Sequence, residues 1–213
     1  MTRARFITLE GIEGAGKSTV AQLVQQWLTS QGIRAELTRE PGGTPLAERV
    51  REIVLEPGKE QIAPTAETLL MFAARRIHLD NRIRPALASG TWIVCDRFTD
   101  ATRAYQGGGR GVDPALIETL AASIHCDLWP DCTLLLDVPV ALGLQRLRSR
   151  GAAPDRFETE RAPFFERVRT AYLELARREA GRVRLIDASG TLESVQAQVI
   201  GVLKSVLAQK DPP

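Results

Sequence analysis

Cysteine is scarce in this sequence, with only Cys95, Cys126 and Cys132 among 213 residues. No two of them form a C-x-x-C pair, and their number is odd. Both features disfavour a disulfide framework and a zinc site built on paired cysteines. We therefore expect reduced, structural thiols.

Long apolar runs and an excess of one charge are also lacking. No stretch approaches the roughly 20 residues that a helix needs to cross a bilayer. Residues 1–5 lead into a strand pattern without an apolar signal segment. The 28 basic and 26 acidic side chains leave a net charge of only +2, so no global field attracts nucleic acid or anionic lipid. We expect a cytoplasmic protein that binds neither nucleic acid nor membrane.

The order of apolar segments predicts the fold class. With 44% hydrophobic residues, a chain of this length can bury one sizeable core. Apolar runs alternate with segments of helical period, which is typical of a doubly wound α/β sheet with helices on both faces. The predicted strands are residues 5–10, 33–38, 91–96, 133–137 and 183–187. We predict about five parallel strands in a single domain, residues 1–213.

Helix signals fill the intervals between these strands. Helices are predicted to begin near Lys17, Pro45, Pro64, Pro114, Pro139, Pro163 and Leu192. The buried face of the first is predicted at Val20, Leu23, Val24, Trp27 and Leu28. Inward side chains of the second and third are expected at Leu46, Val50, Ile53 and Val54, and at Leu69, Leu70, Ala73 and Ile77.

The strongest chemical motif is a phosphate-binding loop. The pattern G-x-x-x-x-G-K-[S/T] is matched by Gly11, Ile12, Glu13, Gly14, Ala15, Gly16, Lys17 and Ser18. In such a loop backbone N–H groups surround phosphate oxygens, Lys17 can bridge the β- and γ-phosphates, and Ser18 can bind Mg²⁺. The motif predicts a P-loop NTPase-type fold that binds a nucleoside triphosphate. A glycine-rich turn that binds nothing is the alternative.

The loop alone does not choose the reaction, because GTPases, ATPases and kinases all use it. A guanine-reading N-K-x-D segment, which a GTPase needs, is missing. The third predicted strand ends in Asp96 and Arg97. The carboxylate can hold magnesium through water while the guanidinium binds a second phosphate. A plain ion pair between the two is the alternative.

Four further segments narrow the reaction: residues 38–43, 70–76, 96–98 and 104–111. In this order and spacing, and with the phosphate loop, they resemble the bacterial thymidylate kinase family from about residue 6 to about residue 187. The resemblance implies a nucleoside monophosphate kinase-like domain. It also implies ATP- and magnesium-dependent phosphorylation of dTMP to dTDP by a cytoplasmic homodimer.

The resemblance implies roles for the acceptor site as well. Phe72 would stack on thymine and Arg76 would hydrogen-bond it, a pairing supported because positions i and i+4 share one helix face. Arg97, assisted by Arg51, would bind the dTMP phosphate. Glu13 would lie near the sugar 3′-hydroxyl and the transferred phosphate. The other implied acceptor residues are Glu40, Thr102, Tyr105, which closes over the deoxyribose, and Gln106.

Each of these residues also has an ordinary structural interpretation. Core packing would explain Phe72 by itself, and a helix surface facing water would explain Gln106. Arg51 could be a surface charge paired with Glu48 or Glu52. The small hydroxyl residue often found in the family at position 101 is replaced by Ala101, which affects fine affinity and not the reaction class.

A basic segment around residues 146–158 is predicted to be a lid. Phosphoryl transfer develops charge on equatorial oxygens, and an arginine delivered there can contribute about 10³ to 10⁵ in rate. Arg146, predicted to bind ATP, Arg150 and Arg156 are the candidates, with a Gly-Ala-Ala-Pro hinge at residues 151–154. A solvated basic turn is the alternative.

Two other functions remain open at the level of sequence. A related kinase with a different acceptor base would share the loop and lid. A nucleotide-sensing module would hold ATP while a partner protein reads the bound state. Phe72, Arg76 and Tyr105 disfavour the first, and the number of candidate acceptor residues disfavours the second.

Overall fold

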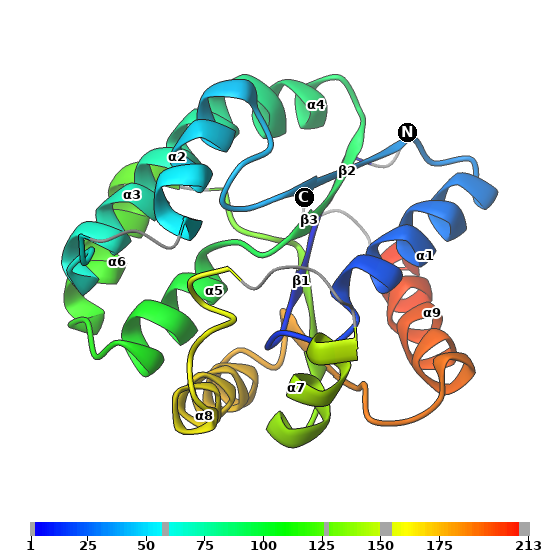
Figure 1. Cartoon of the computed structure of the whole chain (residues 1–213). Coiled ribbons are helices and arrows are strands. Elements are labelled where there is room, and N and C mark those ends of the chain that lie inside the picture. The colour runs from blue at the N-terminus through cyan, green and yellow to red at the C-terminus, as the bar shows by residue number, and fades with distance from the viewer. Residues whose placement is uncertain (1–2, 57–59, 126–127, 150–154, 209–213) are drawn as a thin grey trace.

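A five-stranded parallel sheet forms the centre of the protein (Figure 1). The computed structural model describes residues 3–56, 60–125, 128–149 and 155–208. The strands are β1 (Phe6–Glu10), β2 (Ala35–Arg39), β3 (Trp92–Asp96), β4 (Cys132–Asp137) and β5 (Val183–Asp187). Their order is β2-β3-β1-β4-β5, and every neighbouring pair is parallel. The predicted doubly wound sheet is confirmed.

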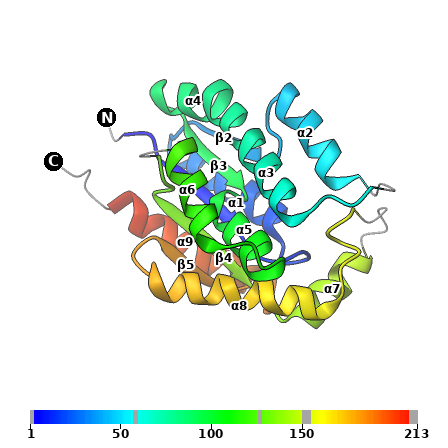
Figure 2. The ribbon, with the colours of Figure 1, turned by 90° about the vertical axis from the view of Figure 1, so that its left-hand side faces the viewer.

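Helices cover both faces of the sheet. In Figure 2, α3, α6 and α8 lie in front of the sheet and α1 lies behind it. The helices are α1 (Lys17–Ser30), α2 (Pro45–Leu55), α3 (Pro64–His78), α4 (Arg84–Ala88), α5 (Thr99–Thr102), α6 (Pro114–His125), α7 (Val140–Ser149), α8 (Ala162–Arg178) and α9 (Leu192–Ala208). Two π-helical turns, η1 (Leu79–Ile83) and η2 (Arg103–Gly109), follow α3 and α5. The seven predicted helices are present, whereas the helical residues 79–88 and 99–109 lie outside the predicted elements.

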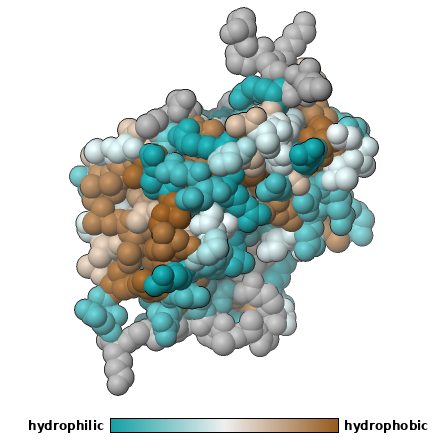
Figure 3. Space-filling view, turned by 90° about the horizontal axis from the view of Figure 1, so that it is seen from above, coloured by the Kyte–Doolittle hydropathy of each residue, from teal (hydrophilic) through white to brown (hydrophobic). Residues whose placement is uncertain are grey.

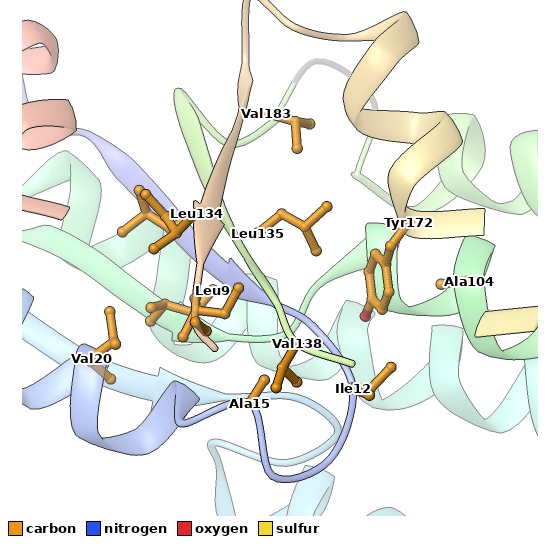
Figure 4. Packing of buried hydrophobic residues seen from close by; sticks show 14 of the residues in the cluster. Leu9, Ile12, Ala15, Val20, Ala104, Leu134, Leu135, Val138, Tyr172 and Val183 are labelled. Atoms are coloured by element: carbon orange, nitrogen blue, oxygen red, sulfur yellow. The ribbon is translucent and has the colours of Figure 1, made fainter. Parts of the chain in front are cut away.

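The main core packs around the central strand β1. Figure 4 shows Leu9 of β1, Val20 of α1 and Leu134 of β4 in this core, and all three are buried. Fully burying one such aliphatic side chain stabilises a fold by about 1.5–3 kcal/mol. The predicted face of α1 is confirmed, because Val24 and Leu28 are also fully buried. Among the described residues, no helix has both the length and the apolar composition of a membrane span.

The predicted inward faces of α2 and α3 are partly wrong. Leu46, Ile53 and Leu69 are 52%, 57% and 49% exposed, and Ala73 is exposed as well. On α2 the buried residues are Ala47 and Val54. On α3 they include charged side chains, and the full set is Glu67, Thr68, Met71, Phe72, Ala74, Arg75 and His78. Hydrophobic periodicity misplaces this face because it cannot count buried charges that have partners elsewhere in the chain.

The carboxyl ends of β1 and β3 lie side by side and position the site. The two strands pair in register, with Leu9 opposite Asp96. The backbone N–H of Arg97 then donates to the Leu9 carbonyl at 2.9 Å. In open parallel sheets, ligands bind outside the carboxyl ends of the strands. The loop after β1 and the Asp96-Arg97 pair therefore meet at one edge.

Candidate active site

The phosphate loop joins β1 to α1 in the expected strand-turn-helix context. Gly14 adopts a left-handed φ of 72°, and a Cβ placed there would lie 2.0 Å from the carbonyl oxygen of Gly143 in α7. Glycine is therefore required at this position both for conformation and for space. Gly11, Ile12 and Ala15 belong to the same loop and are buried.

Lys17 lies folded into the loop. Its Nζ donates to the carbonyls of Gly11 at 3.1 Å and Ile12 at 3.0 Å. Burial, followed by repulsion from Arg97, lowers the pKa of Lys17, and Asp96 and Glu13 oppose this effect. A bound phosphate would oppose this lowering, because a nearby anion favours the charged ammonium.

A cavity of about 510 Å³ opens at the edge where the loop and β3 meet. Thirteen of the predicted site residues line it: Glu13, Gly14, Gly16, Lys17, Ser18, Glu40, Arg51, Asp96, Arg97, Thr102, Tyr105, Gln106 and Arg146. Met71, Arg75 and Phe98 line it as well and are missing from the sequence prediction. The cavity therefore runs from the phosphate loop to α3 and η2.

Arg97 occupies a strained position in the middle of this cavity. Its φ of 73° is the only positive value at a non-glycine residue in the described part of the chain. Such conformations cost of order 1–3 kcal/mol and concentrate at functional sites. The guanidinium donates to Gly11 O at 3.1 Å and to Glu13 Oε1 at 2.9 Å. Burial alone would lower the pKa of Arg97, but Tyr105 and Glu13 hold it well above its usual value.

Glu13 and Tyr105 complete a network around that guanidinium. The Tyr105 hydroxyl donates to Glu13 Oε2 at 2.6 Å, and Arg97 donates to the same hydroxyl oxygen at 3.0 Å. The Arg97 guanidinium carbon also lies 4.6 Å from the centroid of the Tyr105 ring. Burial raises the pKa of Tyr105 well above its usual value, so the phenol remains a donor at neutral pH.

A second arginine faces the same space from α2. Arg51 donates to the Pro41 carbonyl at 2.9 Å. Burial, followed by repulsion from Arg39, lowers the pKa of Arg51. Glu48 accepts from Arg39 at 2.9 Å, and its charge opposes the lowering of the Arg51 pKa. Arg51 lines the cavity, so it is placed to act as a cation there.

The predicted base-binding pair on α3, Phe72 and Arg76, lies outside the cavity lining. Phe72 is 1% exposed and packs with Val112 and Ile117, outside the cavity lining. Arg76 is exposed and pairs with Asp80 at 2.7 Å. The side chains that do line the cavity are their neighbours Met71 and Arg75, which also stand at positions i and i+4. The helix phase that faces the cavity therefore differs from the predicted one, because polar side chains occupy the buried face of α3.

Arg75 is held by partners distant in sequence. Its Nε donates to Glu40 Oε2 at 2.7 Å and its Nη2 donates to Thr102 Oγ1 at 3.1 Å. Among the described residues Nη1 has no hydrogen-bond partner, although it is buried. Burial would raise the pKa of Glu40, but Arg75, followed by His78, lowers it below its usual value. Glu40 thus holds Arg75 in place and leaves one donor for a ligand.

The loop and β3 provide oxygen atoms that fit a magnesium ion. Asp96 Oδ1 is buried and has no hydrogen-bond partner in the described part of the chain. Ser18 lies exposed in the first turn of α1 and lines the same cavity. The described residues contain no group of three or more acidic, His or Cys side chains that could hold a metal by themselves. One or two protein ligands suit Mg²⁺, which takes its other ligands from phosphates and water.

The predicted lid is only partly described. Arg146 lines the cavity and donates to the Ala188 carbonyl at 2.9 Å. Arg150 and the hinge 151–154 lie outside the described residues. Arg156 does not line the cavity, because its guanidinium donates to Val54 O at 2.9 Å and to Glu67. The neighbouring Phe157 does line it.

Comparison with known proteins shows the family to which the chain belongs. The sequence pattern described as thymidylate kinase matches residues 9–199. The chain belongs to the thymidylate kinase family. The thymidylate kinase of Chromohalobacter salexigens is 56% identical over 209 residues, which are 98% of this chain and 99% of that protein. The thymidylate kinase of Alkalilimnicola ehrlichii is 54% identical over 98% of this chain and 96% of that protein.

A solved structure extends the likeness to the fold of the thymidylate kinase family. The crystal structure of thymidylate kinase from Ehrlichia chaffeensis superposes with a TM-score of 0.76 at 33% sequence identity. The superposition covers 94% of this chain and 99% of that one. Both the sequence match and the structural match therefore span nearly the whole chain.

Proposed function

We propose that this enzyme transfers the γ-phosphoryl group of ATP to the phosphate of dTMP, producing dTDP and ADP. The observation that carries the proposal is one cavity that joins a complete phosphate loop to a separate pair of arginines, Arg51 and Arg97, and to an unpaired donor on Arg75. One cavity thus offers the loop to a triphosphate, the arginine pair to a second phosphate, and the Arg75 donor to a hydrogen-bond acceptor on a base.

The transfer itself needs positioning and charge compensation. An oxygen of the dTMP phosphate forms a bond to the γ-phosphorus while the bond from that phosphorus to the bridging oxygen breaks and ADP leaves. Lys17 exchanges its two loop carbonyls for phosphate oxygens, and Arg97 and Arg51 hold the acceptor phosphate in line. Arg146, on the cavity wall, binds the nucleotide from the side of α7.

Ser18 and Asp96 are the residues that would hold magnesium. When bound, the ion compensates the negative charge of the ATP phosphates during transfer. The unpaired, buried Oδ1 of Asp96 supports this role, because a buried acceptor without a donor is costly unless a cation or water satisfies it.

The base is recognised at the end of the cavity formed by α3 and η2. Arg75 Nη1 donates to the O4 carbonyl of thymine, and Gln106 and Thr102 provide polar contacts nearby. Tyr105 lies between this end and Glu13, where it covers the deoxyribose while Glu13 faces the 3′-hydroxyl. Met71, in place of Phe72, provides the apolar surface beside the base.

The proposal includes a single kinase domain, residues 1–213, whose lid around residues 146–158 closes over ATP. Arg150 and Arg156 remain the candidate lid arginines. For Arg156 this requires release from Glu67 and Val54 as the lid moves. A cytoplasmic location also belongs to the proposal, because the free, buried thiols of Cys95 and Cys132 suit a reducing compartment.

A homodimer is the assembly we propose. Figure 3 shows hydrophobic surface gathered on the left of the view, the side on which α2 and α3 lie in Figure 1. Leu46 and Ile53 of α2 and Leu69 of α3 are large exposed hydrophobic side chains of these two helices. A second copy that presents the same face would bury these side chains about a two-fold axis.

An acceptor panel tests the proposed reaction. ADP release is measured with ATP and Mg²⁺ while dTMP, dUMP, dCMP, dGMP, AMP and thymidine are offered separately, with EDTA and Lys17→Ala as controls. We expect selective turnover of dTMP that both controls abolish. Turnover of another acceptor would overturn the base assignment. Tight ATP binding without turnover of any acceptor would favour a nucleotide-sensing module.

A further inference from the structure

We infer that Glu67 is a positioning residue that makes the enzyme select keto pyrimidines over cytosine by fixing the orientation of the Gln106 amide. The inference rests on the function proposed above and concerns the same acceptor pocket. Glu67 belongs to α3, is fully buried and is not a lining residue of the cavity. It therefore acts on the base only through Gln106.

The contact between the two side chains is direct. Gln106 Nε2 donates to Glu67 Oε1 at 2.7 Å, and both side chains are buried. A carboxylate accepts hydrogen bonds and cannot donate them, so only the NH₂ end of the amide can face Glu67. The Gln106 Oε1 carbonyl is consequently turned away from Glu67. Because Gln106 lines the cavity, this carbonyl is presented to a ligand as an acceptor.

Two arginines hold the Glu67 carboxylate in this role. Arg156 donates to Oε2, the oxygen that Gln106 does not use. Arg110 Nε lies 3.6 Å from the same oxygen. With the lid in this position the carboxylate is oriented by both arginines, and when the lid proposed above releases Arg156, Arg110 remains beside Oε2. The amide of Gln106 meets a fixed acceptor before any substrate binds.

The resulting pattern of donors and acceptors matches one class of base. Arg75 Nη1 offers a donor and Gln106 Oε1 offers an acceptor. Thymine and uracil present the complementary pair, an O4 acceptor beside an N3–H donor. Cytosine presents an amino donor at C4 and an acceptor at N3, so both contacts become repulsive. Glu67 thereby contributes to rejection of dCMP but not to rejection of dUMP.

Glu67→Gln tests the inference, because a carboxamide can donate or accept and so permits Gln106 to turn. We compare kcat/KM for dTMP, dCMP and dUMP in the wild-type and variant enzymes. The dTMP to dCMP ratio should fall about tenfold or more, while the dTMP to dUMP ratio stays unchanged. A purely structural effect would lower all three values together and leave both ratios at their wild-type level, which would overturn the inference.

A control variant isolates the amide contact. Glu160→Gln removes another carboxylate of this arginine cluster, the one that pairs with Arg110 at 2.5 Å, and should leave the dTMP to dCMP ratio unchanged. A ratio altered equally by Glu160→Gln would contradict the role of Glu67. A wild-type enzyme that does not prefer dTMP would instead refute the proposed function, before any variant is compared.

If Glu67→Gln fails to fold, nuclear magnetic resonance of the wild-type enzyme tests whether the Gln106 amide is held in a fixed orientation. The Gln106 side-chain amide is assigned in ¹⁵N spectra by its loss in Gln106→Leu. We expect one of its NH₂ protons to be protected from solvent exchange both in the free enzyme and with dTMP bound. Rapid exchange of both protons in the free enzyme would show that the amide is not held and would overturn the inference.

Discussion

Tyr105 donates a hydrogen bond of 2.6 Å to Glu13, a residue of the phosphate loop 92 positions earlier in the chain. Arg97 holds the other oxygen of the same carboxylate at 2.9 Å. Tyr105 of η2 and Arg97 after β3 are therefore both attached to the phosphate loop through one carboxylate. In the function proposed above, Arg97 exchanges Glu13 for the acceptor phosphate.

Arg75 and Arg76 are neighbours in the sequence, but Arg75 lines the cavity and Arg76 is exposed on the surface of α3. Arg75→Lys keeps the charge but loses the planar fork that reaches Glu40, Thr102 and a ligand. We expect kcat/KM for dTMP to fall about ten- to a hundredfold, because a charge-assisted hydrogen bond is worth about 1.5–3 kcal/mol. Arg76→Lys, at the exposed pair with Asp80, should stay within about twofold of wild type. The reverse order in steady-state kinetics would restore the original assignment of Arg76.

Alanine substitutions at Gly14 and Gly32 distinguish the cost of a strained backbone from the cost of a steric clash. Both have a left-handed φ, 72° and 75°, but a Cβ meets the Gly143 carbonyl at Gly14 and finds nothing within 4 Å at Gly32. Gly32→Ala should lower the free energy of unfolding by about 1–2 kcal/mol. Gly14→Ala should lower it further and weaken ATP binding. Urea unfolding without nucleotide makes the comparison, and equal losses would show that α7 yields to the new methyl group.

Glu10 links stability to pH. Burial, followed by repulsion from Asp100, raises the pKa of Glu10 from 4.5 to about 8. The folded protein therefore holds a proton that the unfolded chain has lost. The stability contributed by this proton is fully present below pH 4.5 and is lost as pH rises to about 8, with a slope of up to about 1.4 kcal/mol per pH unit.

Glu10→Gln removes this titration and should flatten the dependence between pH 5 and pH 8. The amide carbonyl can still accept from the Phe98 N–H, which faces Glu10 Oε1 at 2.7 Å, while the NH₂ group can donate to the Tyr172 hydroxyl oxygen, which lies 2.6 Å from Oε2. Urea unfolding at several pH values provides the measurement. An unchanged slope in the variant would mean that other groups govern stability in this range.

The exposed leucines allow a matched test of the dimer. Leu69 of α3 and Leu185 of β5 are 49% and 53% exposed, but only Leu69 lies on the proposed shared face. Leu69→Glu should convert a dimer to monomers, because it would place two like charges in an apolar interface. Leu185→Glu should leave the mass unchanged in sedimentation equilibrium. A monomeric wild-type protein would refute the proposed assembly.

Local sequence was sufficient for the central elements of the site. The strand, the loop of residues 11–18 and the amphipathic helix after it lie in one continuous segment, so their pattern determines both backbone and chemistry. The position of Asp96 and Arg97 was equally predictable, because the carboxyl ends of parallel strands lie at the same edge of a sheet. We propose that these positions carry the phosphate chemistry.

Only the tertiary structure decided which face of α3 lines the pocket. Arg75 is buried because Glu40 and Thr102, 35 and 27 positions away, satisfy its guanidinium. The hydrophobic periodicity of the helix contains no information about such distant partners. It predicted that Leu69 and Ala73 lie on the buried face of α3, but both are exposed. The partner of Arg156, Glu67, is 89 positions away and was equally hidden. Sequence determines the chemistry of contiguous motifs, whereas long-range pairing of buried charges decides which side chains reach the substrate.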